Sequence, residues 1–443
     1  MNTILVLGAG RSSYSLITHL LQLAPAEGWN VIVGDASLDA ARARVGNSPY
    51  GKAIAFDIHA EEASHEAIAQ ASLVVSLLPA HFHPLVAKHC LLLGKHLLNA
   101  SYVSDEIRQY HDEAQSKGLL FLCECGLDPG IDHMSAMQVI DRIRHDGGQL
   151  LSFESFTGGL IARDTDPGNP WRYKFTWNPR NVVMAGQGTA KFLRNGQYKY
   201  IPYQQLFKRI TPVNVPGYGQ YEGYVNRDSL KYRETYGLQN IETLVRGTLR
   251  NEGFCSAWDI LVQAGCCDDT YLMEGVDRMT HRSFLNAFLE YHPTRSVEEK
   301  LVARFALHPH GGELDRLRWS GLFNEEPVGL TQGTPAQILE YILNKKWALN
   351  TSDKDQIVMW HRFVYKHGVA TREIQASLIA TGQDSNLTAM GQTVGLPLAL
   401  AARLVYRGEV KTRGVAIPVA KEFYDPILAG LKDLGIELQE RYI

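Results

Sequence analysis

Two side chains that can exchange protons, those of Asp128 and Tyr102, lie at positions where a hydrophobic core does not explain them. Asp128 lies within Gly126–His133, a stretch of sequence Gly-Leu-Asp-Pro-Gly-Ile-Asp-His. Two glycines and a proline within five residues predict a sharp, rigid corner there. Tyr102 offers a phenol at a position where a proton donor is useful. Two plainer interpretations stay open, namely that Asp128 and Asp132 only cap the following helix and that Tyr102 only covers the end of a strand.

The elements around these residues place them at one edge of a sheet. The apolar runs 96–98 and 119–123 are typical of buried strands, and residues 131–147 have apolar side chains at helical spacing. Tyr102 therefore follows one strand, and the corner joins the next strand to a helix. Open α/β sheets bind ligands at the carboxyl ends of their strands, so both residues are expected near a ligand.

The N-terminus has the pattern of a dinucleotide-binding loop. Gly8-Ala9-Gly10-Arg11-Ser12-Ser13 follows an apolar strand over residues 3–7 and precedes an apolar-periodic helix. The first glycine allows the turn, and the second lets the backbone approach a pyrophosphate, which the helix N-terminus then holds. This pattern predicts a cofactor site that includes the following residues: Gly8, Gly10, Arg11, Ser12 and Ser13.

Four further residues are predicted to contact the cofactor. Asp35 ends the second strand, where an acid binds the ribose 2′-hydroxyl and repels a 2′-phosphate, so it predicts NAD with NADP as the other possibility. Asp57 follows the third strand and is placed to meet the adenine, although a strand-end cap explains it equally well. Leu78 and Pro79 end the fourth strand, on the nicotinamide side.

Cationic and histidine side chains outside this pattern have plain explanations as well as functional ones. Arg42 and Arg44 are interpreted as a solvated helix face, and His81 and His83 as exposed loop residues. Arginines flanked by small residues and apolar strands, such as Arg227 and Arg246, suggest carboxylate clamps because the guanidinium fork fits a carboxylate. Pairing with internal acids is the alternative.

The overall composition predicts a soluble globular protein of two or three domains. The chain has 443 residues, a net charge of -3 and six cysteines. It is too long for one core, and its charge balance disfavours nucleic acid or an anionic membrane as a partner. The first apolar run is too short for a signal peptide or membrane span, the cysteines suit a reduced cytoplasmic protein, and no histidine lies at metal-ligand spacing. No metal is expected.

Five strands alternating with helices predict a doubly wound parallel sheet. Beyond the corner, a mixed pattern of strands and loops runs to about residue 254 and is followed by helices alone over 255–345. Residues 357–363 are expected to return as a strand and residues 388–406 to form a helix.

Six ordered motifs along the chain resemble the saccharopine reductase family, also called saccharopine dehydrogenase, L-glutamate-forming. The motifs are the corner, Ser101-Tyr102, Gly158-Gly159-Leu160, Tyr173-Lys174-Phe175, Asn226-Arg227-Asp228-Ser229 and Arg246-Gly247-Thr248-Leu249-Arg250.

The resemblance implies three domains and a homodimer. A Rossmann-type dinucleotide-binding domain is expected over 1–125 and 386–443. An α/β domain with a mixed sheet, for substrate binding and dimerisation, is expected over 126–254 and 346–385, and a small all-helical domain over 255–345.

The resemblance also implies an NAD(P)-dependent oxidoreductase of lysine metabolism that acts on CH-NH and on small amino-acid substrates. It interconverts saccharopine with L-glutamate and 2-aminoadipate 6-semialdehyde through an imine, with Asp128 and Tyr102 as candidates for moving protons. The implied substrate-binding residues are Ser101, Asp128, Gly158, Gly159, Lys174, Arg227, Arg246 and Thr248. Leu127 and Pro129 are implied at the cofactor.

Two alternatives remain from the sequence. A related imine reductase such as carboxynorspermidine dehydrogenase has a polycationic substrate and should need acids in its pocket, whereas these motifs are rich in arginine. A non-catalytic NAD-binding regulator would not need Asp128, Tyr102 and several carboxylate clamps.

The basic residue that fungal members of the family carry after the second strand is replaced here by Gly34-Asp35-Ala36, which again predicts NAD.

Overall fold

The structure is a computed structural model that describes residues 2–443, and the chain divides into two compact units. Unit 1 runs to Leu150 and also holds Lys366–Ala370 and Leu378–Glu440. Unit 2 holds Leu151–Tyr365, Thr371–Ser377 and Arg441–Ile443. The helices predicted over 255–345 fall within unit 2, and the division into three domains stays a prediction.

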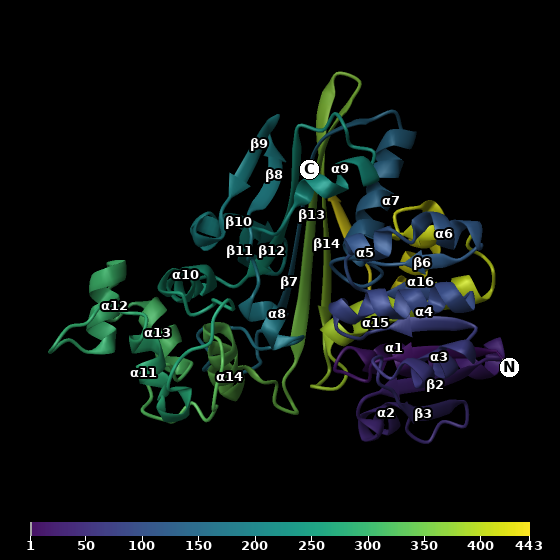
Figure 1. Cartoon of the computed structure of the whole chain (residues 1–443). Coiled ribbons are helices and arrows are strands. Elements are labelled where there is room, and N and C mark those ends of the chain that lie inside the picture. The colour runs from purple at the N-terminus through teal and green to yellow at the C-terminus, as the bar shows by residue number, and fades with distance from the viewer. Residues whose placement is uncertain (1) are drawn as a thin grey trace. The chain divides into compact units, whose positions relative to one another are not determined.

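Unit 1 is built on a seven-stranded parallel sheet of order β15-β6-β5-β4-β1-β2-β3 (Figure 1). Its first six strands have the 3-2-1-4-5-6 order of a doubly wound nucleotide-binding sheet, so the predicted Rossmann-type fold is confirmed. A C-terminal strand pairs beside β6. The strands are β1 (Thr3–Leu7), β2 (Asn30–Asp35), β3 (Gly51–Ala55), β4 (Leu73–Ser76), β5 (His96–Asn99), β6 (Leu120–Leu122) and β15 (Gly414–Ala416).

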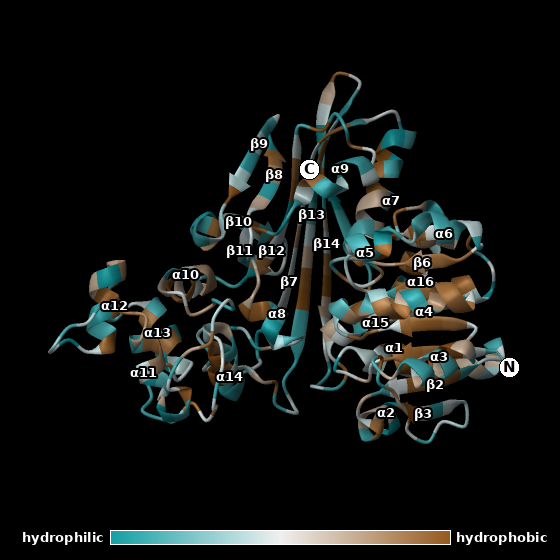
Figure 2. Cartoon of the chain, in the orientation of Figure 1, coloured by the Kyte–Doolittle hydropathy of each residue, from teal (hydrophilic) through white to brown (hydrophobic). Residues whose placement is uncertain are grey.

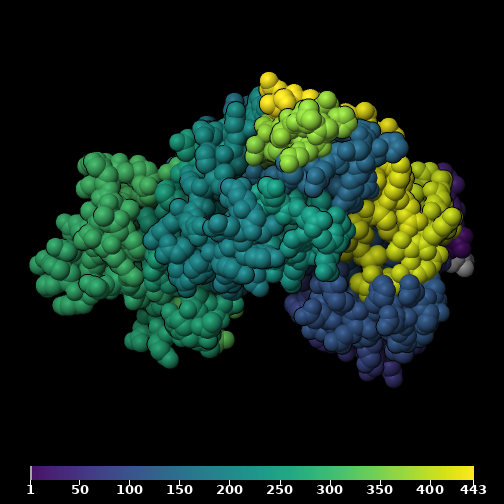
Figure 3. Space-filling view, turned by 90° about the horizontal axis from the view of Figure 1, so that it is seen from above, coloured from purple at the N-terminus to yellow at the C-terminus, as the bar shows by residue number. Residues whose placement is uncertain are grey.

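The helices of unit 1 connect these strands. They are α1 (Ser13–Glu27), α2 (Leu38–Val45), α3 (Glu61–Ala69), α4 (His83–Leu93), α5 (Asp105–Arg108), α6 (His111–Ser116), α7 (Ile131–His145), α15 (Ala389–Tyr406) and α16 (Lys421–Asp433), with a 3-10 turn η1 (Ala80–Phe82). Helix α1 packs on α15, where a Cβ at Gly395 would lie 2.8 Å from the backbone nitrogen of Leu16. In Figure 3 the C-terminal residues of unit 1 (yellow) lie beside segments from its first 150 residues (blue), as α16 packs on α7.

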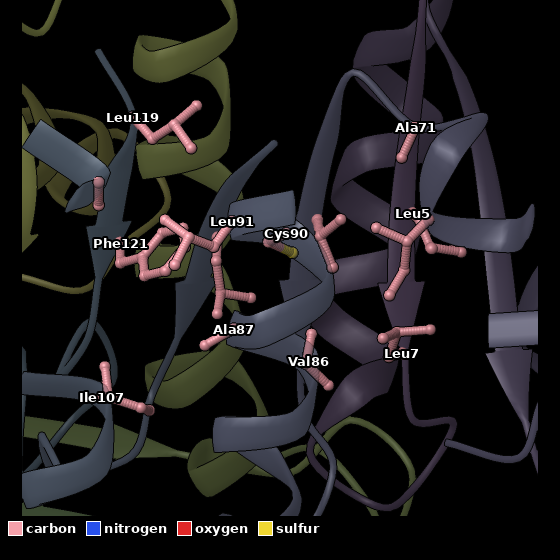
Figure 4. Close-up of a cluster of buried hydrophobic side chains, with 14 of the residues drawn as sticks. Leu5, Leu7, Ala71, Val86, Ala87, Cys90, Leu91, Ile107, Leu119 and Phe121 are labelled. Atoms are coloured by element: carbon pink, nitrogen blue, oxygen red, sulfur yellow. The ribbon is translucent and has the colours of Figure 1, made fainter. Parts of the chain in front are cut away.

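The core of unit 1 follows from the apolar runs of its strands. Every residue of β1, β4 and β6 is buried, as expected for parallel strands covered on both faces. Strand β6 is coloured hydrophobic in Figure 2. In one layer of the core, Leu5 and Leu7 of β1 and Phe121 of β6 share a cluster with Val86 and Cys90 of α4 (Figure 4). The buried sheet leaves only its strand ends and loops to carry polar chemistry.

The second sheet, most of whose residues belong to unit 2, is mixed and nine-stranded. Its main path is β10-β11-β12-β7-β13-β14-β16, with β8 pairing β12 and β9. Strands β12 and β7 are parallel, whereas β11 and β12 are antiparallel. The strands are β7 (Gln149–Ile161), β8 (Ala190–Arg194), β9 (Gln197–Ile201), β10 (Thr211–Val215), β11 (Gly219–Val225), β12 (Thr243–Arg250), β13 (Asp355–His367), β14 (Ala370–Thr381) and β16 (Gln439–Tyr442).

The remaining elements of unit 2 are helical. They are α8 (Pro179–Val183), α9 (Tyr232–Thr235), α10 (Phe254–Ala264), α11 (His281–Asn286), α12 (Val297–Phe305), α13 (Gly312–Trp319) and α14 (Pro335–Trp347), with the 3-10 turns η2 (Tyr203–Lys208), η3 (Ser229–Lys231) and η4 (Val276–Arg278). The mixed sheet and the helices agree with the predicted fold class.

Three whole-chain observations bear on cofactor and environment. Among residues 2–443, no helix has the length and apolar character needed to cross a bilayer. Over the same residues, no group of three or more His, Cys, Asp or Glu side chains is arranged to hold a metal ion. All six cysteines are unpaired and buried.

Candidate active site

The glycine-rich loop leaves β1 as a tight turn. Gly8 has a φ of +103°, and a Cβ there would lie 3.0 Å from the carbonyl of Leu77. A Cβ at Gly10 would meet nothing within 4 Å, so the loop keeps room for a group to approach its backbone. Because helix α1 begins at Ser13, the loop and the helix N-terminus fit a pyrophosphate.

The serines of the loop differ in role. Ser13 is fully buried, and its hydroxyl donates to the carbonyl oxygen of Gly10 at 2.8 Å. Ser12 is the N-cap residue of α1, and Arg11 is exposed beside it. Ser13 therefore holds the shape of the loop, whereas Arg11 and Ser12 lie at its surface.

Asp35 is tied to the main chain. Its Oδ2 accepts a hydrogen bond from the backbone nitrogen of Ala9 at 2.7 Å, and its Oδ1 accepts one from the nitrogen of Ser37 at 2.9 Å. Both carboxylate oxygens thus link the glycine-rich loop to the end of β2. This structural role explains an acid at the position without reference to a ribose.

Arg44 also braces the glycine-rich loop, which the sequence interpretation missed. Its guanidinium donates to the carbonyl oxygens of Ala9 and Gly10, each at 3.2 Å. The expectation of a solvated face is therefore wrong for Arg44, because α2 turns this half-buried side chain toward the loop. Arg42 is exposed and pairs with Asp39 three residues away at 3.3 Å.

The other predicted cofactor residues lie at strand ends of the same sheet. Asp57 is exposed, and its Oδ1 accepts from the backbone nitrogen of His59 at 2.9 Å, so it caps the turn after β3. Leu78 and Pro79 follow β4, which lies next to β1. Leu127 and Pro129 are buried in the corner after β6.

The corner brings the two predicted acid–base residues together. Gly130 has a φ of +146°, and a Cβ on it would lie 2.1 Å from the carbonyl oxygen of Gly126, so the turn closes on itself. Asp128 is half-buried there, and Tyr102 Oη donates to its Oδ1 at 3.3 Å. A phenol bonded to a carboxylate can pass a proton in either direction.

Ser101 is fixed beside this pair. Its backbone nitrogen donates to Oδ1 of Asn99 at 2.9 Å, and its hydroxyl lies 2.9 Å from Nε2 of His83. Nδ1 of His83 lies 3.1 Å from the hydroxyl of Ser76. The histidine is only 2% exposed, so the expectation of an exposed loop residue is wrong.

Burial determines the protonation of His83. Removal from water, with a smaller contribution from nearby His81, lowers the pKa of His83 to about 4. The ring is therefore neutral near pH 7, and it can donate to one serine hydroxyl and accept from the other. The only sequence signal for this residue was its position after β4.

In unit 2, three predicted residues lie on two neighbouring parallel strands. Gly158 follows Thr157 on β7, and Thr157 is the register partner of Thr248 on β12. A Cβ at Gly158 would lie 2.7 Å from the carbonyl oxygen of Leu249, so packing requires this glycine. Gly159 comes next and is half-buried.

Two predicted arginines lie near the same strands of unit 2. The guanidinium of Arg246 is centred 4.1 Å from the ring of Tyr232, and the residue is 7% exposed. Arg227 has a φ of +52°, which is unusual for a residue other than glycine. The backbone connects the two segments, because the nitrogen of Asn226 donates to the carbonyl oxygen of Arg246 at 2.9 Å.

Lys174 is an ion-pair residue. Its Nζ lies 2.7 Å from Asp353 and 3.0 Å from Asp166, and its side chain is only 2% exposed. Burial by itself lowers the pKa of Lys174, but the hydrogen bonds to Asp353 and Asp166 outweigh that effect, so the pKa is raised. Its positive charge is thus already matched within unit 2.

Comparison with known proteins agrees with this architecture. Residues 4–122 match the saccharopine dehydrogenase NADP binding domain, and residues 126–436 match the saccharopine dehydrogenase C-terminal domain. The chain is 31% identical to saccharopine dehydrogenase [NADP(+), L-glutamate-forming] of Schizosaccharomyces pombe, over 100% of this chain and 99% of that protein. It is 34% identical to alpha-aminoadipic semialdehyde synthase of Arabidopsis thaliana over 93% of this chain, which is 40% of that longer protein.

Comparison with solved structures also finds similarity to a saccharopine dehydrogenase. Apo saccharopine dehydrogenase (L-Glu forming) from Saccharomyces cerevisiae superposes with a TM-score of 0.88 at 30% identity, covering 100% of both chains. The homospermidine synthase of Legionella pneumophila has a TM-score of 0.57 at 10% identity, which is a similarity of fold alone.

These relatives overturn the expected preference for NAD. The matching N-terminal family model is an NADP binding domain, and the fungal relatives are named for NADP(+). The prediction from Asp35 is therefore wrong. Asp35 has a structural role that its sequence position did not show, since its two oxygens bond to backbone nitrogens of the loop and of Ser37.

Two family models cover nearly the whole length, and a full-length relative exceeds 30% identity. The chain belongs to the saccharopine dehydrogenase family.

Proposed function

We propose that this chain is an NADP-dependent oxidoreductase acting on CH-NH, which interconverts saccharopine with L-glutamate and 2-aminoadipate 6-semialdehyde. The observation that carries the proposal is the end-to-end similarity to a fungal saccharopine dehydrogenase. The geometry at the corner supports it, because Tyr102 and Asp128 offer the acid–base group that forming and hydrolysing an imine requires.

The proposed reaction balances as saccharopine, NADP⁺ and water giving glutamate, the semialdehyde, NADPH and a proton. NADP, which the glycine-rich loop after β1 would hold, would supply the hydride acceptor. Loss of the hydride from the CH₂ carbon that becomes the aldehyde leaves a C=N bond to the glutamate nitrogen. Asp128 takes the proton of the substrate amine before this step. Water then adds to the imine carbon and gives a carbinolamine. Its C–N bond breaks as the nitrogen gains a proton, and loss of the hydroxyl proton forms the aldehyde.

Within this proposal Asp128 moves the protons and Tyr102 relays them. Tyr102 Oη donates to Oδ1 of Asp128 in the absence of substrate, so the two groups are already in contact. When Asp128 is protonated, the same pair can return the proton to the departing nitrogen. Ser101, placed by Asn99 and His83, is proposed to bind the substrate beside them.

Residues of unit 2 are proposed to recognise the carboxylates of the substrate. Arg227 and Arg246 supply guanidinium groups, and the Arg246 guanidinium is oriented by the ring of Tyr232. Gly158, Gly159 and Thr248 are proposed to contact the substrate through backbone or hydroxyl groups. Lys174 remains a predicted substrate residue whose charge is already shared by two aspartates.

The test is the initial rate of saccharopine oxidation with NADP and, separately, NAD, with reduced nicotinamide and released glutamate both measured. We expect equal amounts of the two products, and faster reaction with NADP. Cofactor binding without any saccharopine-dependent reduction would contradict the proposed reaction and would favour a non-catalytic role.

We also propose a cytoplasmic homodimer. Six buried, unpaired thiols suit a reducing compartment. Within the described chain β9 pairs only with β8, and it exposes Tyr198 and Tyr200, which are 53% and 56% exposed. Aromatic side chains on an outer strand are typical of contact surfaces.

A further inference from the structure

Glu124 is a buried carboxylate at the start of the corner. It follows β6 by two residues, is 5% exposed, and has a φ of +55°. A charged-type side chain is seldom buried, and a non-glycine residue is seldom found in this backbone region. Both features cost stability, so the surrounding contacts must hold the residue in place.

The contacts of Glu124 bracket Tyr102. Its backbone nitrogen donates to the carbonyl oxygen of Ser101 at 3.0 Å. Its side-chain Oε1 accepts from the backbone nitrogen of Val103 at 3.1 Å. One residue therefore binds the main chain immediately before and immediately after the tyrosine.

The second side-chain oxygen of Glu124 reaches the helix on the far side of the corner. Oε2 lies 2.8 Å from Nε2 of His133, which is fully buried in the first turn of α7. The nitrogen of Ile131, the first residue of this helix, donates to the carbonyl oxygen of Gly126 at 2.8 Å. The chain between these points carries Asp128.

We propose that Glu124, with His133, is a positioning residue for the Tyr102–Asp128 pair. It joins the loop of Tyr102 to the helix that follows Asp128, and so sets the separation of the phenol and the carboxylate. The phenol–carboxylate contact of 3.3 Å is longer than most O–H···O hydrogen bonds, so a small displacement breaks it. The inference rests on the proposed function only for its effect on turnover.

The main test is a double-mutant cycle between Glu124→Ala and Tyr102→Phe. Glu124→Ala is expected to lower kcat about 10- to 100-fold and to change the Kd of NADP less than about twofold. In the Tyr102→Phe background the same change should lower kcat less than about threefold, because the group that it positions is already gone. Equal losses in both backgrounds would overturn the proposal.

Conservative variants guard against a general folding defect. Glu124→Gln keeps an oxygen for the nitrogen of Val103 and should retain more turnover than Glu124→Ala, and His133→Asn should behave like Glu124→Ala in the cycle. Asp259→Asn is the matched control, because Asp259 is a buried carboxylate of α10 in unit 2 and is 9% exposed. If Glu124→Ala does not fold, the double-mutant cycle with Tyr102→Phe is measured with Glu124→Gln and with His133→Asn instead.

A measurement without turnover separates the inference from the proposed function. With 3-fluorotyrosine placed only at position 102, the ¹⁹F resonance should shift or broaden in Glu124→Gln and stay unchanged in Asp259→Asn. An unchanged resonance in Glu124→Gln would overturn the positioning role. If the wild-type chain fails to oxidise saccharopine but this resonance responds, the proposed function fails and the positioning role stands.

Discussion

At the scale of single residues, the proposed chemistry depends on a carboxylate and a phenol that different loops bring within 3.3 Å. Asp128 is half-buried, which strengthens its interaction with a charged partner while leaving it accessible. The surrounding polar groups, Ser101, His83 and Glu124, bond to backbone or to one another. The pair therefore stands in a preformed setting of the kind that catalysis requires.

Asp128→Asn is expected to lower kcat about 100-fold or more, because an amide cannot accept and return a proton. The Kd of NADP should change little, since the residue is assigned to the substrate. Steady-state kinetics with saccharopine and calorimetry with NADP check the two parts. Asp146→Asn, an exposed residue just after α7, is the control. Unchanged turnover in Asp128→Asn would remove the residue from the mechanism.

His83 predicts a pH dependence of stability. Its pKa is about 4 in the folded chain against 6.5 for the free side chain, so between these values the unfolded state binds a proton that the folded state does not. Its contribution to stability is complete above pH 6.5 and is lost as the pH falls toward 4.

The measurement is the urea midpoint of unfolding between pH 7.5 and 4.5. His83→Asn should weaken the fall in midpoint with falling pH, although it lowers the midpoint at neutral pH by removing two hydrogen bonds. His145→Asn, at an exposed position of α7, should leave the pH dependence as in the wild type. If the urea midpoint falls equally with pH in the wild type, in His83→Asn and in His145→Asn, then the pKa of His83 is not lowered in the folded chain.

At the scale of elements, the corner 126–133 and the loop that carries Lys174 are stabilised in different ways. The corner is closed by hydrogen bonds between its own backbone groups, including the nitrogen of Gly126 to the carbonyl oxygen of Pro129 at 3.0 Å. The loop that carries Lys174 is instead held by contacts with residues far along the chain.

Gly130→Ala should destabilise the chain strongly, by about 3 kcal/mol or more, because the added Cβ would overlap the backbone of Gly126. Gly147→Ala is the matched control, since Gly147 also has a positive φ, +79°, but a Cβ there meets nothing within 4 Å. It should cost only about 1 kcal/mol through backbone strain. Thermal unfolding of both variants checks the difference, and equal losses would mean that the corner is not sterically closed.

Lys174→Met should lower the free energy of unfolding by about 3–5 kcal/mol, because it leaves the carboxylates of Asp353 and Asp166 without their cation. Lys231→Met, at an exposed position, is the control. Urea unfolding checks the expectation. A stable Lys174→Met variant with a raised KM for saccharopine would instead support direct substrate binding.

At the scale of the whole molecule, the parallel sheet of unit 1 collects the loops after β1, β4, β5 and β6 at the carboxyl ends of its strands. Unit 2, taken by itself, has a mixed sheet whose parallel neighbours β7 and β12 carry Gly158 and Thr248. The proposed cofactor residues thus belong to unit 1 and the proposed arginine clamps to unit 2.

The proposed homodimer predicts a mass in solution of twice the 49.5 kDa of the chain. Size-exclusion chromatography with light scattering measures it directly. A combined Tyr198→Ser and Tyr200→Ser variant should weaken the dimer if β9 lies in the interface, whereas Tyr291→Ser, at an 89% exposed position elsewhere in unit 2, should not. A single-chain mass at all concentrations would contradict the dimer.

Features that repeat along the chain or lie within one loop were predictable from the amino-acid pattern. Buried strands and amphipathic helices have their own periodicity, so the doubly wound sheet, the glycine-rich loop and the strand–corner–helix around Asp128 were predictable. Sheet topology then placed Tyr102 and Asp128 at the same edge. Their proximity could be expected because parallel strands end at one side of a sheet.

The partners of the polar side chains, in contrast, depend on how the chain folds in three dimensions. Lys174 meets Asp353 across 179 positions, His83 is buried between two serines, and both oxygens of Asp35 bond to backbone nitrogens. A residue's type does not reveal such partners, because they come from parts of the chain that folding brings together. For the same reason the sequence did not show that Asp35 binds the glycine-rich loop, or that Glu124 contacts the neighbours of Tyr102.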